Sequence, residues 1–127
     1  MTVETFSPKD LFQPIGPYSH IARAGNFIMI SGTPGVDSAS GKLAGDDAYS
    51  QSKQIIKNFR HMLESCGSSL EKVMHVHVFL KNVEDFAQMN RAYSEEFGLH
   101  QPARTVICIN DLPKKDALLT MNLTAIS

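Results

Sequence analysis

The sequence predicts an α+β sandwich, in which one sheet carries two helices on a single face. Short apolar runs rich in β-branched residues predict the strands, and two segments whose apolar residues recur every three or four positions predict the helices. A predicted strand separates the two helices along the chain, which favours one sheet that both of them cover. The 127 residues contain no repeat and no long linker, so we expect a single domain over residues 1–127.

The first clear strand is expected at residues 26–31, "NFIMIS", an apolar run that Gly32 ends. The segment "GTPGVDSASGKLAGDD" follows and is dense in Gly, Pro, Ser and Asp. It predicts a loop, with a short hairpin at Lys42-Leu43. Further strand material is expected in the part of the chain before the first helix.

The first helix has recognisable ends and one buried stripe. Asp46 or Asp47 can cap its beginning, and Cys66-Gly67 can end it. Apolar residues at spacings of three and four define the stripe that should face the sheet, namely Ile55, Ile56, Phe59, Met62 and Leu63.

Residues 72–80, "KVMHVHVFL", alternate as a strand does. The first set of side chains is purely apolar and should pack on the helices; it comprises Met74, Val76, Val78 and Leu80. The opposite set is mixed in character, which is typical of a subunit interface; it comprises Val73, His75, His77 and Phe79. Two histidines on one strand face can also bind zinc, but no third ligand is apparent, so an interface or core pair is preferred.

The second helix should begin at a cap on Asn82, with Asp85 at the third position, and continue to about Phe97 before Gly98. One side of it carries Phe86, Met89, Asn90, Tyr93 and Phe97. Strands at 104–110 and around 117–125 complete the predicted order β-α-β-α-β-β.

Composition excludes several classes of protein. Twelve basic and thirteen acidic residues give a formal charge of −1, so the chain lacks the basic character of a nucleic-acid-binding domain. No run of 18 apolar residues occurs, and the first residues do not resemble a secretion signal, so we expect neither membrane insertion nor export. Cys66 and Cys108 are isolated and are expected to be free thiols. A cytoplasmic protein is therefore expected.

Arg104 is the most informative charged residue. It begins the apolar run Thr105–Ile109, and the nearest acidic residues in the sequence are Glu96 and Asp111. An arginine without a nearby acid at the mouth of a buried strand suggests an anion that is not part of the chain.

Five separated segments of the sequence together match the pattern of one protein family. In this order and spacing, "PIGPYSH", "ISGTPG", "QSKQIIKNF", "EDFAQMNRAYSEEF" and "PARTVICINDLP" resemble the RidA/YjgF family of imine and enamine deaminases. The resemblance extends from about residue 5 to the end of the chain.

This resemblance implies a chorismate-mutase-like sandwich with a mixed, mostly antiparallel sheet, assembled as a homotrimer with its sites in the clefts between subunits. It also implies hydrolysis of small 2-imino or enamine acids, such as 2-aminoacrylate or 2-iminobutyrate, to the 2-keto acid and ammonia. Neither a cofactor nor a metal is implied. The expected partners are further copies of the chain and a small carboxylate substrate.

Residue roles follow from the same resemblance. Arg104 matches the arginine that holds the substrate carboxylate, and a planar guanidinium suits that task. Tyr18 matches a tyrosine that lines the pocket, and Asn90 an asparagine near the site. Ser31 and Gly32 match small residues whose backbone approaches the ligand.

The chain departs from the family pattern at three positions. Val106 stands where members acting on 2-aminoacrylate commonly have cysteine, and Cys108 follows two residues later. Thr120 or Asn122 falls where the family has the glutamate thought to position water. Thr33 replaces a common glutamine and hints at a pathway-specific deaminase of the 2-aminomuconate or aminoacrylate type. A trimer that binds small carboxylates without catalysis is the other alternative, because neither Thr nor Asn takes up a proton near neutral pH.

Overall fold

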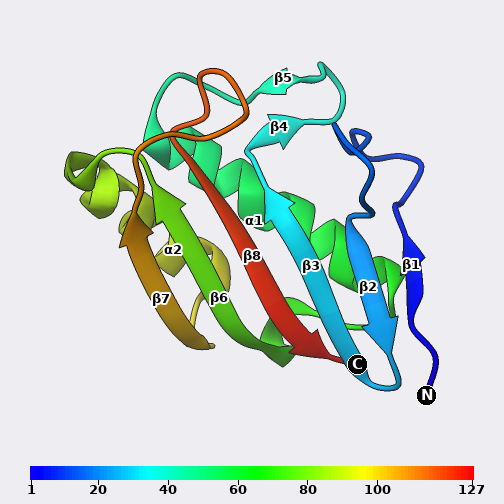
Figure 1. The fold of residues 1–127 in the computed structure, drawn as a ribbon. Helices are drawn as coiled ribbons and strands as arrows, with labels where there is room; N and C mark the ends of the chain where they lie inside the picture. Colours follow the sequence, from blue (N-terminus) through cyan, green and yellow to red (C-terminus); the bar gives the residue numbers. More distant parts are fainter.

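The computed structural model describes residues 1–127 and places both helices on one face of a six-stranded sheet, as Figure 1 shows. The strand order in this sheet is β1-β2-β3-β8-β6-β7. The six strands are β1 Glu4–Phe6, β2 Ile21–Ala24, β3 Phe27–Thr33, β6 Val73–Leu80, β7 Ala103–Cys108 and β8 Leu119–Ile126. The other elements are α1 Ala48–Ser65, α2 Phe86–Phe97 and the small hairpin β4 Val36–Asp37 with β5 Lys42–Leu43.

The sheet is mixed and mostly antiparallel. All neighbouring strands run antiparallel except β6 and β7, which are parallel and are joined through α2. A parallel pair needs such a crossover, and the helix in it covers the same face as α1. The predicted α+β architecture is therefore confirmed, as is the hairpin at Lys42-Leu43.

Helix α1 has the ends that its sequence predicts. The Ser50 N–H donates to the Asp47 carboxylate at 2.8 Å, and this bond lowers the pKa of Asp47. Gly67 follows the helix with a φ of 73°, a conformation that favours glycine. The predicted stripe is fully buried against the sheet.

The predicted start of the second helix is wrong. Asn82 precedes a short 3-10 turn at Val83–Asp85, and α2 itself begins at Phe86. Asparagine is a residue type that often caps helices, but the Asn82 side chain forms no capping hydrogen bond. The end of the helix at Gly98 is confirmed, with a φ of 64°.

The predicted faces of strand β6 are wrong at its beginning. Val73 is buried and Met74 is 49% exposed, the reverse of the expectation, because the register with β8 shifts between Val73 and His75. One irregular residue exchanges the two faces of a strand. From His75 onward the prediction is confirmed, since Val76, Val78 and Leu80 are fully buried.

A buried glutamine joins α1 to two loops. Gln51 is fully buried, and its amide nitrogen donates to the carbonyls of Gly45 at 2.9 Å and Asp116 at 3.3 Å. Its amide oxygen accepts from the Leu118 N–H at 2.9 Å. This side chain thus fixes the approach to β8, where Thr120 lies.

Replacing Gln51 by alanine is expected to lower the free energy of unfolding by about 1–3 kcal/mol, because it leaves three partly buried backbone groups without partners. Urea unfolding measures the change. The control is Gln88→Ala, since Gln88 lies on the exposed side of α2 and accepts one bond, from the Tyr49 N–H. Equal stability of the two variants would contradict the role given to Gln51.

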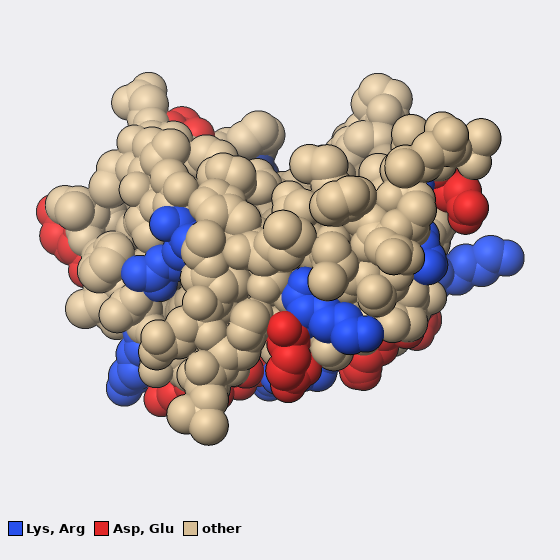
Figure 2. All heavy atoms as spheres, turned by 90° about the horizontal axis from the view of Figure 1, so that it is seen from below, with Lys and Arg blue, Asp and Glu red and all other residues tan.

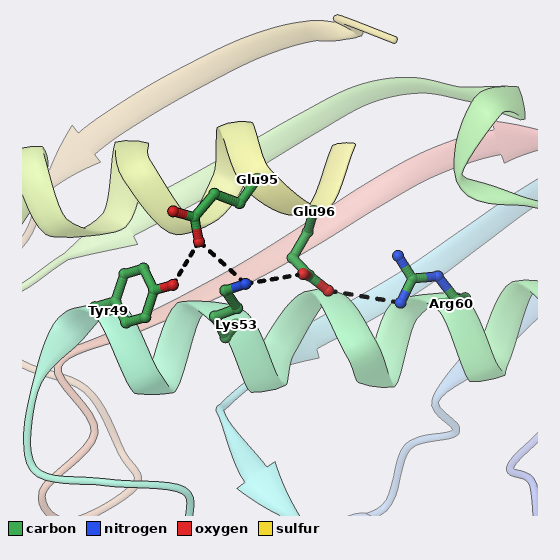
Figure 3. A network of polar contacts seen from close by, with 5 residues as sticks. All are labelled: Tyr49, Lys53, Arg60, Glu95 and Glu96. Atoms are coloured by element: carbon green, nitrogen blue, oxygen red, sulfur yellow. Dashed lines mark hydrogen bonds and ion pairs between the residues drawn. The ribbon is translucent and has the colours of Figure 1, made fainter. Parts of the chain in front are cut away.

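An ion-pair network joins the two helices on their outer side (Figure 3). Lys53 lies 3.1 Å from Glu95 and 3.2 Å from Glu96, and Arg60 lies 3.5 Å from Glu96. The Tyr49 hydroxyl donates to Glu95, and this bond is the main reason that the pKa of Glu95 is lowered. The network orients α2, which carries Asn90, relative to α1.

The sheet face opposite the helices carries no Lys, Arg, Asp or Glu on its strands. In Figure 2 most charged side chains lie in the lower half of the view, on the helix side, and the hollowed upper edge is mainly uncharged. Strand register and burial place these residues on that face: Phe27, Met29, His75, His77, Phe79, Thr105, Ile107, Thr120, Asn122 and Thr124. We call this set the open face. No helix combines the length and apolarity that a membrane span needs.

Candidate functional site

Arg104 lies on edge strand β7 and turns toward helix α2. It is paired in register with the buried Val76, so its side chain is on the helix side of the sheet. One guanidinium nitrogen donates to the Asn90 side-chain oxygen at 2.8 Å. Arg104 forms no ion pair with any acidic residue of the chain, so its charge is not neutralised within it.

Two aromatic rings support the guanidinium. Its central carbon lies 4.7 Å from the centre of the Tyr93 ring and 5.8 Å from that of Phe86. Such contacts restrict the plane of the group without occupying all of its N–H donors. Burial raises the pKa of Tyr93 to about 12, so this phenol is neutral at working pH. Arg104 is therefore oriented and retains donors for a carboxylate.

Arg104 lines a cavity of about 360 Å³ between β7 and α2, which we call the arginine cavity. Asn90 and Tyr93 line it as well, and His100 forms part of its wall. His100 is held by a hydrogen bond between its Nε2 and the Val73 carbonyl at 2.8 Å. No acidic side chain contributes to the lining.

A second and larger cavity, of about 580 Å³, is lined by other residues of the predicted site. We call it the tyrosine cavity. Tyr18, Gly32 and Thr120 all line it, although they are far apart in the sequence. The rest of the lining is Phe12, Gln13, Ile15, Gly16, Pro34, Val36, Gly41, Leu112, Pro113 and Lys114. The wall is mainly apolar and contains no acidic side chain.

Buried His20 organises one wall of the tyrosine cavity. Its Nε2 donates to the Phe12 carbonyl at 2.7 Å, and its ring packs edge-on against the Phe12 and Tyr18 rings. The His20 carbonyl accepts from the Ser31 N–H at 2.9 Å. These contacts tie the "GPYS" segment to strand β3.

The Ser31-Gly32 pair lies where the register of β3 with β8 shifts. The Ser31 hydroxyl donates to the Ser19 carbonyl at 2.7 Å, and Ser31 lines neither cavity. Gly32 does line the tyrosine cavity, and a Cβ added there would meet no atom within 4 Å. The fold itself does not require glycine at this position. A side chain at residue 32 would therefore begin in open space at the wall of the cavity.

The two candidates for the place of the family glutamate have different surroundings. Thr120 and Asn122 both lie on the open face, opposite Phe79 and His77 of β6. The Asn122 oxygen lies 3.0 Å from Nδ1 of His77 and lines neither cavity. Thr120 lines the tyrosine cavity, so the geometry favours Thr120 as the residue beside a bound water.

Val106 and Cys108 share the helix-side face with Arg104, as their pairing with Val78 and Leu80 shows. Val106 packs against the hydrophobic core and lines neither cavity. Cys108 is an exposed free thiol at the end of β7, and Cys66 is free and buried.

The chain therefore brings the predicted site residues together in two groups. Arg104 and Asn90 meet in the arginine cavity, whereas Tyr18, Gly32 and Thr120 meet in the tyrosine cavity. The two linings share no residue. Within one chain, the carboxylate anchor and the water-binding hydroxyl thus belong to different sites.

Several lining residues were missed at the level of sequence. Helical spacing places Tyr93 on one side of the second helix but does not predict its contact with Arg104. Leu112, Pro113 and Lys114 end a strand in sequence, and only the tertiary fold brings them beside Tyr18. A cluster of Pro and Gly around Tyr18 was the available signal that a loop forms a wall here.

Comparison with known proteins gives one consistent family. The family described as Endoribonuclease L-PSP matches residues 9–127. A RutC family protein from Pyrococcus abyssi is 42% identical over 113 residues, 89% of this chain and 88% of that protein. The 3-aminoacrylate deaminase RutC of Acinetobacter baylyi is 30% identical over 94% of both chains. A 2-iminobutanoate/2-iminopropanoate deaminase of Dermatophagoides farinae is 30% identical over 80% of both.

Solved structures agree in fold. A protein of Entamoeba histolytica described as an endoribonuclease L-PSP superposes with a TM-score of 0.93 at 32% identity, over 99% of this chain and 100% of that one. The YjgF gene product of Escherichia coli gives a TM-score of 0.90 at 28% identity, over 97% and 98%. The two helices and the mixed sheet are thus arranged as in these proteins.

Proposed function

Because the chain belongs to the RidA/YjgF family, described as Endoribonuclease L-PSP, we propose that it hydrolyses small 2-imino and enamine carboxylic acids. The products are the 2-keto acid and ammonia. The observation that carries this proposal is Arg104, which is oriented by Asn90 and Tyr93 and has no acidic partner. The two relatives above whose names give a substrate are deaminases of this kind.

The reaction needs few groups. The guanidinium of Arg104 holds the substrate carboxylate through paired N–H donors and fixes the position of the neighbouring C2 carbon. An enamine first takes a proton at C3 and becomes the imine. Water then adds to C2 through its oxygen and gives one proton to the nitrogen, which forms a carbinolamine. The proton of the new hydroxyl then also passes to the nitrogen, the C2–N bond breaks, C2 and oxygen become the keto group, and the nitrogen leaves as ammonia.

We assign to Thr120 the role of positioning the attacking water. Its hydroxyl can accept a hydrogen bond from the attacking water or donate one to it, but it does not take up the proton near neutral pH. The loss of a general base typically lowers a rate by about 10²–10⁴-fold. Imines hydrolyse readily without a catalyst, so orientation of C2 and water by Arg104 and Thr120 supplies the acceleration.

The proposal includes a homotrimer of chorismate-mutase-like fold, in which the open faces lie inward. Two observations support it. The open face has no strand residue with a permanent charge, and apolar side chains such as Phe27, Met29 and Ile107 are about half exposed on it. In addition, a cleft between subunits can join the arginine cavity of one chain to the tyrosine cavity of its neighbour. That arrangement brings together the carboxylate anchor and the water-binding hydroxyl, which lie in different cavities of a single chain.

The direct test generates 2-iminobutyrate and 2-aminoacrylate with a PLP-dependent dehydratase and follows the loss of the imine. We expect faster loss when the protein is added, in proportion to its concentration. No acceleration with either substrate would overturn the proposal.

A second candidate function is a trimer that binds small carboxylates without turnover. The observation that favours it is the lack of any acidic side chain in the lining of both cavities. It predicts tight binding of 2-ketobutyrate in calorimetry together with no acceleration in the imine assay.

A pathway-specific deaminase of the 2-aminomuconate or aminoacrylate type is the third candidate function. Thr33, which suggested it, is buried and donates to the Ser31 carbonyl, so it shapes the Gly32 segment rather than contacting substrate.

Replacing Thr120 by glutamate tests whether Thr120 has the place of the missing acid or belongs to a different mechanism. If Thr120 has the place of the missing acid, Thr120→Glu is expected to raise kcat by at least about tenfold, because it supplies a general base. Thr120→Gln is the matched control, since it adds a side chain of the same length at the same position but no group that can take up a proton. A fall in activity of Thr120→Glu to the background rate would show that Thr120 belongs to a different mechanism.

A further inference from the structure

We propose that Lys114 binds a second anionic group of the substrate, so that the chain prefers imino or enamine acids with a carboxylate at each end. This inference rests on the proposed function, because it places the distal end of the substrate in the tyrosine cavity. Lys114 is the only residue with a permanent charge among the thirteen that line this cavity.

The cavity is larger than a simple substrate needs. Its volume of about 580 Å³ falls within the range of roughly 300–1,000 Å³ that holds drug-sized ligands. In the proposed trimer, a three- or four-carbon imino acid held by Arg104 of a neighbouring chain leaves most of this space unfilled. A longer carbon chain would contact the apolar wall formed by Phe12, Ile15 and Leu112.

Lys114 has no anionic partner in the chain. Its side chain is half-buried and forms neither an ion pair nor a hydrogen bond. The acid nearest before it in sequence, Asp111, is paired with Lys81 at 3.3 Å. Asp116 follows it in a turn with a φ of 66°, and its carbonyl, not its carboxylate, is the group engaged by Gln51.

The backbone holds Lys114 in place. The Ala117 N–H donates to the Lys114 carbonyl at 3.2 Å, and Gln51 fixes residues 116 and 118 from the helix side. A cation on a fixed turn, in an apolar wall and without a counter-ion, gains from an anion that enters the cavity. The flexible ammonium suits the end of a chain of variable length, whereas the planar fork of Arg104 suits the carboxylate beside the reacting carbon.

The test compares two substrates that differ at the distal end. Amino-acid oxidases generate 2-iminobutyrate from 2-aminobutyrate and 2-iminoglutarate from glutamate, and kcat/KM is measured for each. We expect the wild type to prefer 2-iminoglutarate by at least about tenfold, since 2-iminobutyrate has no distal carboxylate to form a charge-assisted hydrogen bond with Lys114. Lys114→Ala and Lys114→Gln should each lower this preference by about tenfold or more, mainly through KM, and Lys114→Arg should retain most of it.

Lys115→Ala is the matched control, because Lys115 is exposed and lies outside the cavity lining. It should leave the preference as it is in the wild type. A lysine that only covers apolar surface with its stem would affect both substrates alike. Equal kcat/KM for the two substrates in the wild type, or an equal loss on both in Lys114→Ala, would overturn the inference.

A binding measurement separates this inference from the proposed function. Calorimetry compares 2-ketoglutarate with 2-ketobutyrate in the wild type and in Lys114→Ala. Tighter binding of 2-ketoglutarate that Lys114→Ala abolishes supports the inference even if neither imine is hydrolysed, in which case only the proposed function fails. Equal affinities overturn the inference and leave the hydrolysis of 2-iminobutyrate as a separate result.

Discussion

Arg104→Ala is expected to lower kcat/KM for 2-iminobutyrate by at least about a hundredfold, because the substrate carboxylate loses its charge-assisted partner. Steady-state kinetics measure this loss, and circular dichroism checks that the fold is retained. Arg104→Lys should recover only part of the rate, since an ammonium keeps the charge but lacks the planar pair of donors. The loss should appear for every substrate that carries a carboxylate beside the imine carbon.

The matched control is Arg91→Ala. Arg91 is an exposed arginine on the same helix as Asn90, and it stacks at 4.1 Å on the Tyr49 ring, away from both cavities. Its replacement removes the same charge from the chain and should leave kcat/KM within about twofold of the wild type. An Arg104→Ala variant as active as Arg91→Ala would refute the role of Arg104 as the carboxylate anchor.

Phe79→Glu is expected to abolish both the proposed trimer and the proposed activity. Phe79 is half-buried at the end of β6 on the open face, which carries no lysine or arginine on its strands to pair with a new carboxylate. An unpaired charge in an apolar interface costs several kcal/mol, and threefold symmetry would place it there three times. Light scattering should report a monomer mass for the variant and a trimer mass for the wild type.

Lys57→Glu is the control for this second result. Lys57 is exposed on α1, on the far side of the sheet from the open face, and the substitution changes the charge by more than Phe79→Glu does. It should leave the trimer intact. If the wild type were itself a monomer, or if Phe79→Glu remained a trimer, the inward placement of the open face would be wrong.

Much of the fold follows from local sequence patterns. The stripe from Ile55 to Leu63, the cap at Asp47 and the glycines at 67 and 98 each act within a few residues, so they are readable without tertiary structure. The predictions were wrong where a local sequence pattern is compatible with more than one structure. Asn82 has the residue type of a cap but precedes a 3-10 turn, and the irregularity after Val73 shifts the strand faces without a mark in the sequence.

The site was predictable only in part. Arg104 was identified from its isolation among apolar residues, and the resemblance supplied Tyr18, Gly32 and Asn90. The partition of these residues between two cavities depends on the sheet order, because β7 and β3 lie apart with β8 and β6 between them. Periodicity along the chain contains no information on that order. The position of Lys114 beside Tyr18 could not be predicted for the same reason.

The central claim is that one site uses Arg104 from one chain and the tyrosine cavity from another, and mixed trimers test it most directly. Arg104→Ala lacks the anchor, and Gly32→Phe is expected to fill the cavity, since Gly32 lines it and a Cβ added there meets no atom within 4 Å. Each variant alone is expected to be inactive. Co-refolded in equal amounts, the two should recover about one quarter of the wild-type activity, because one in four interfaces then joins an intact anchor to an intact cavity. Mixed trimers without activity above that of the separate variants would contradict a site shared between chains.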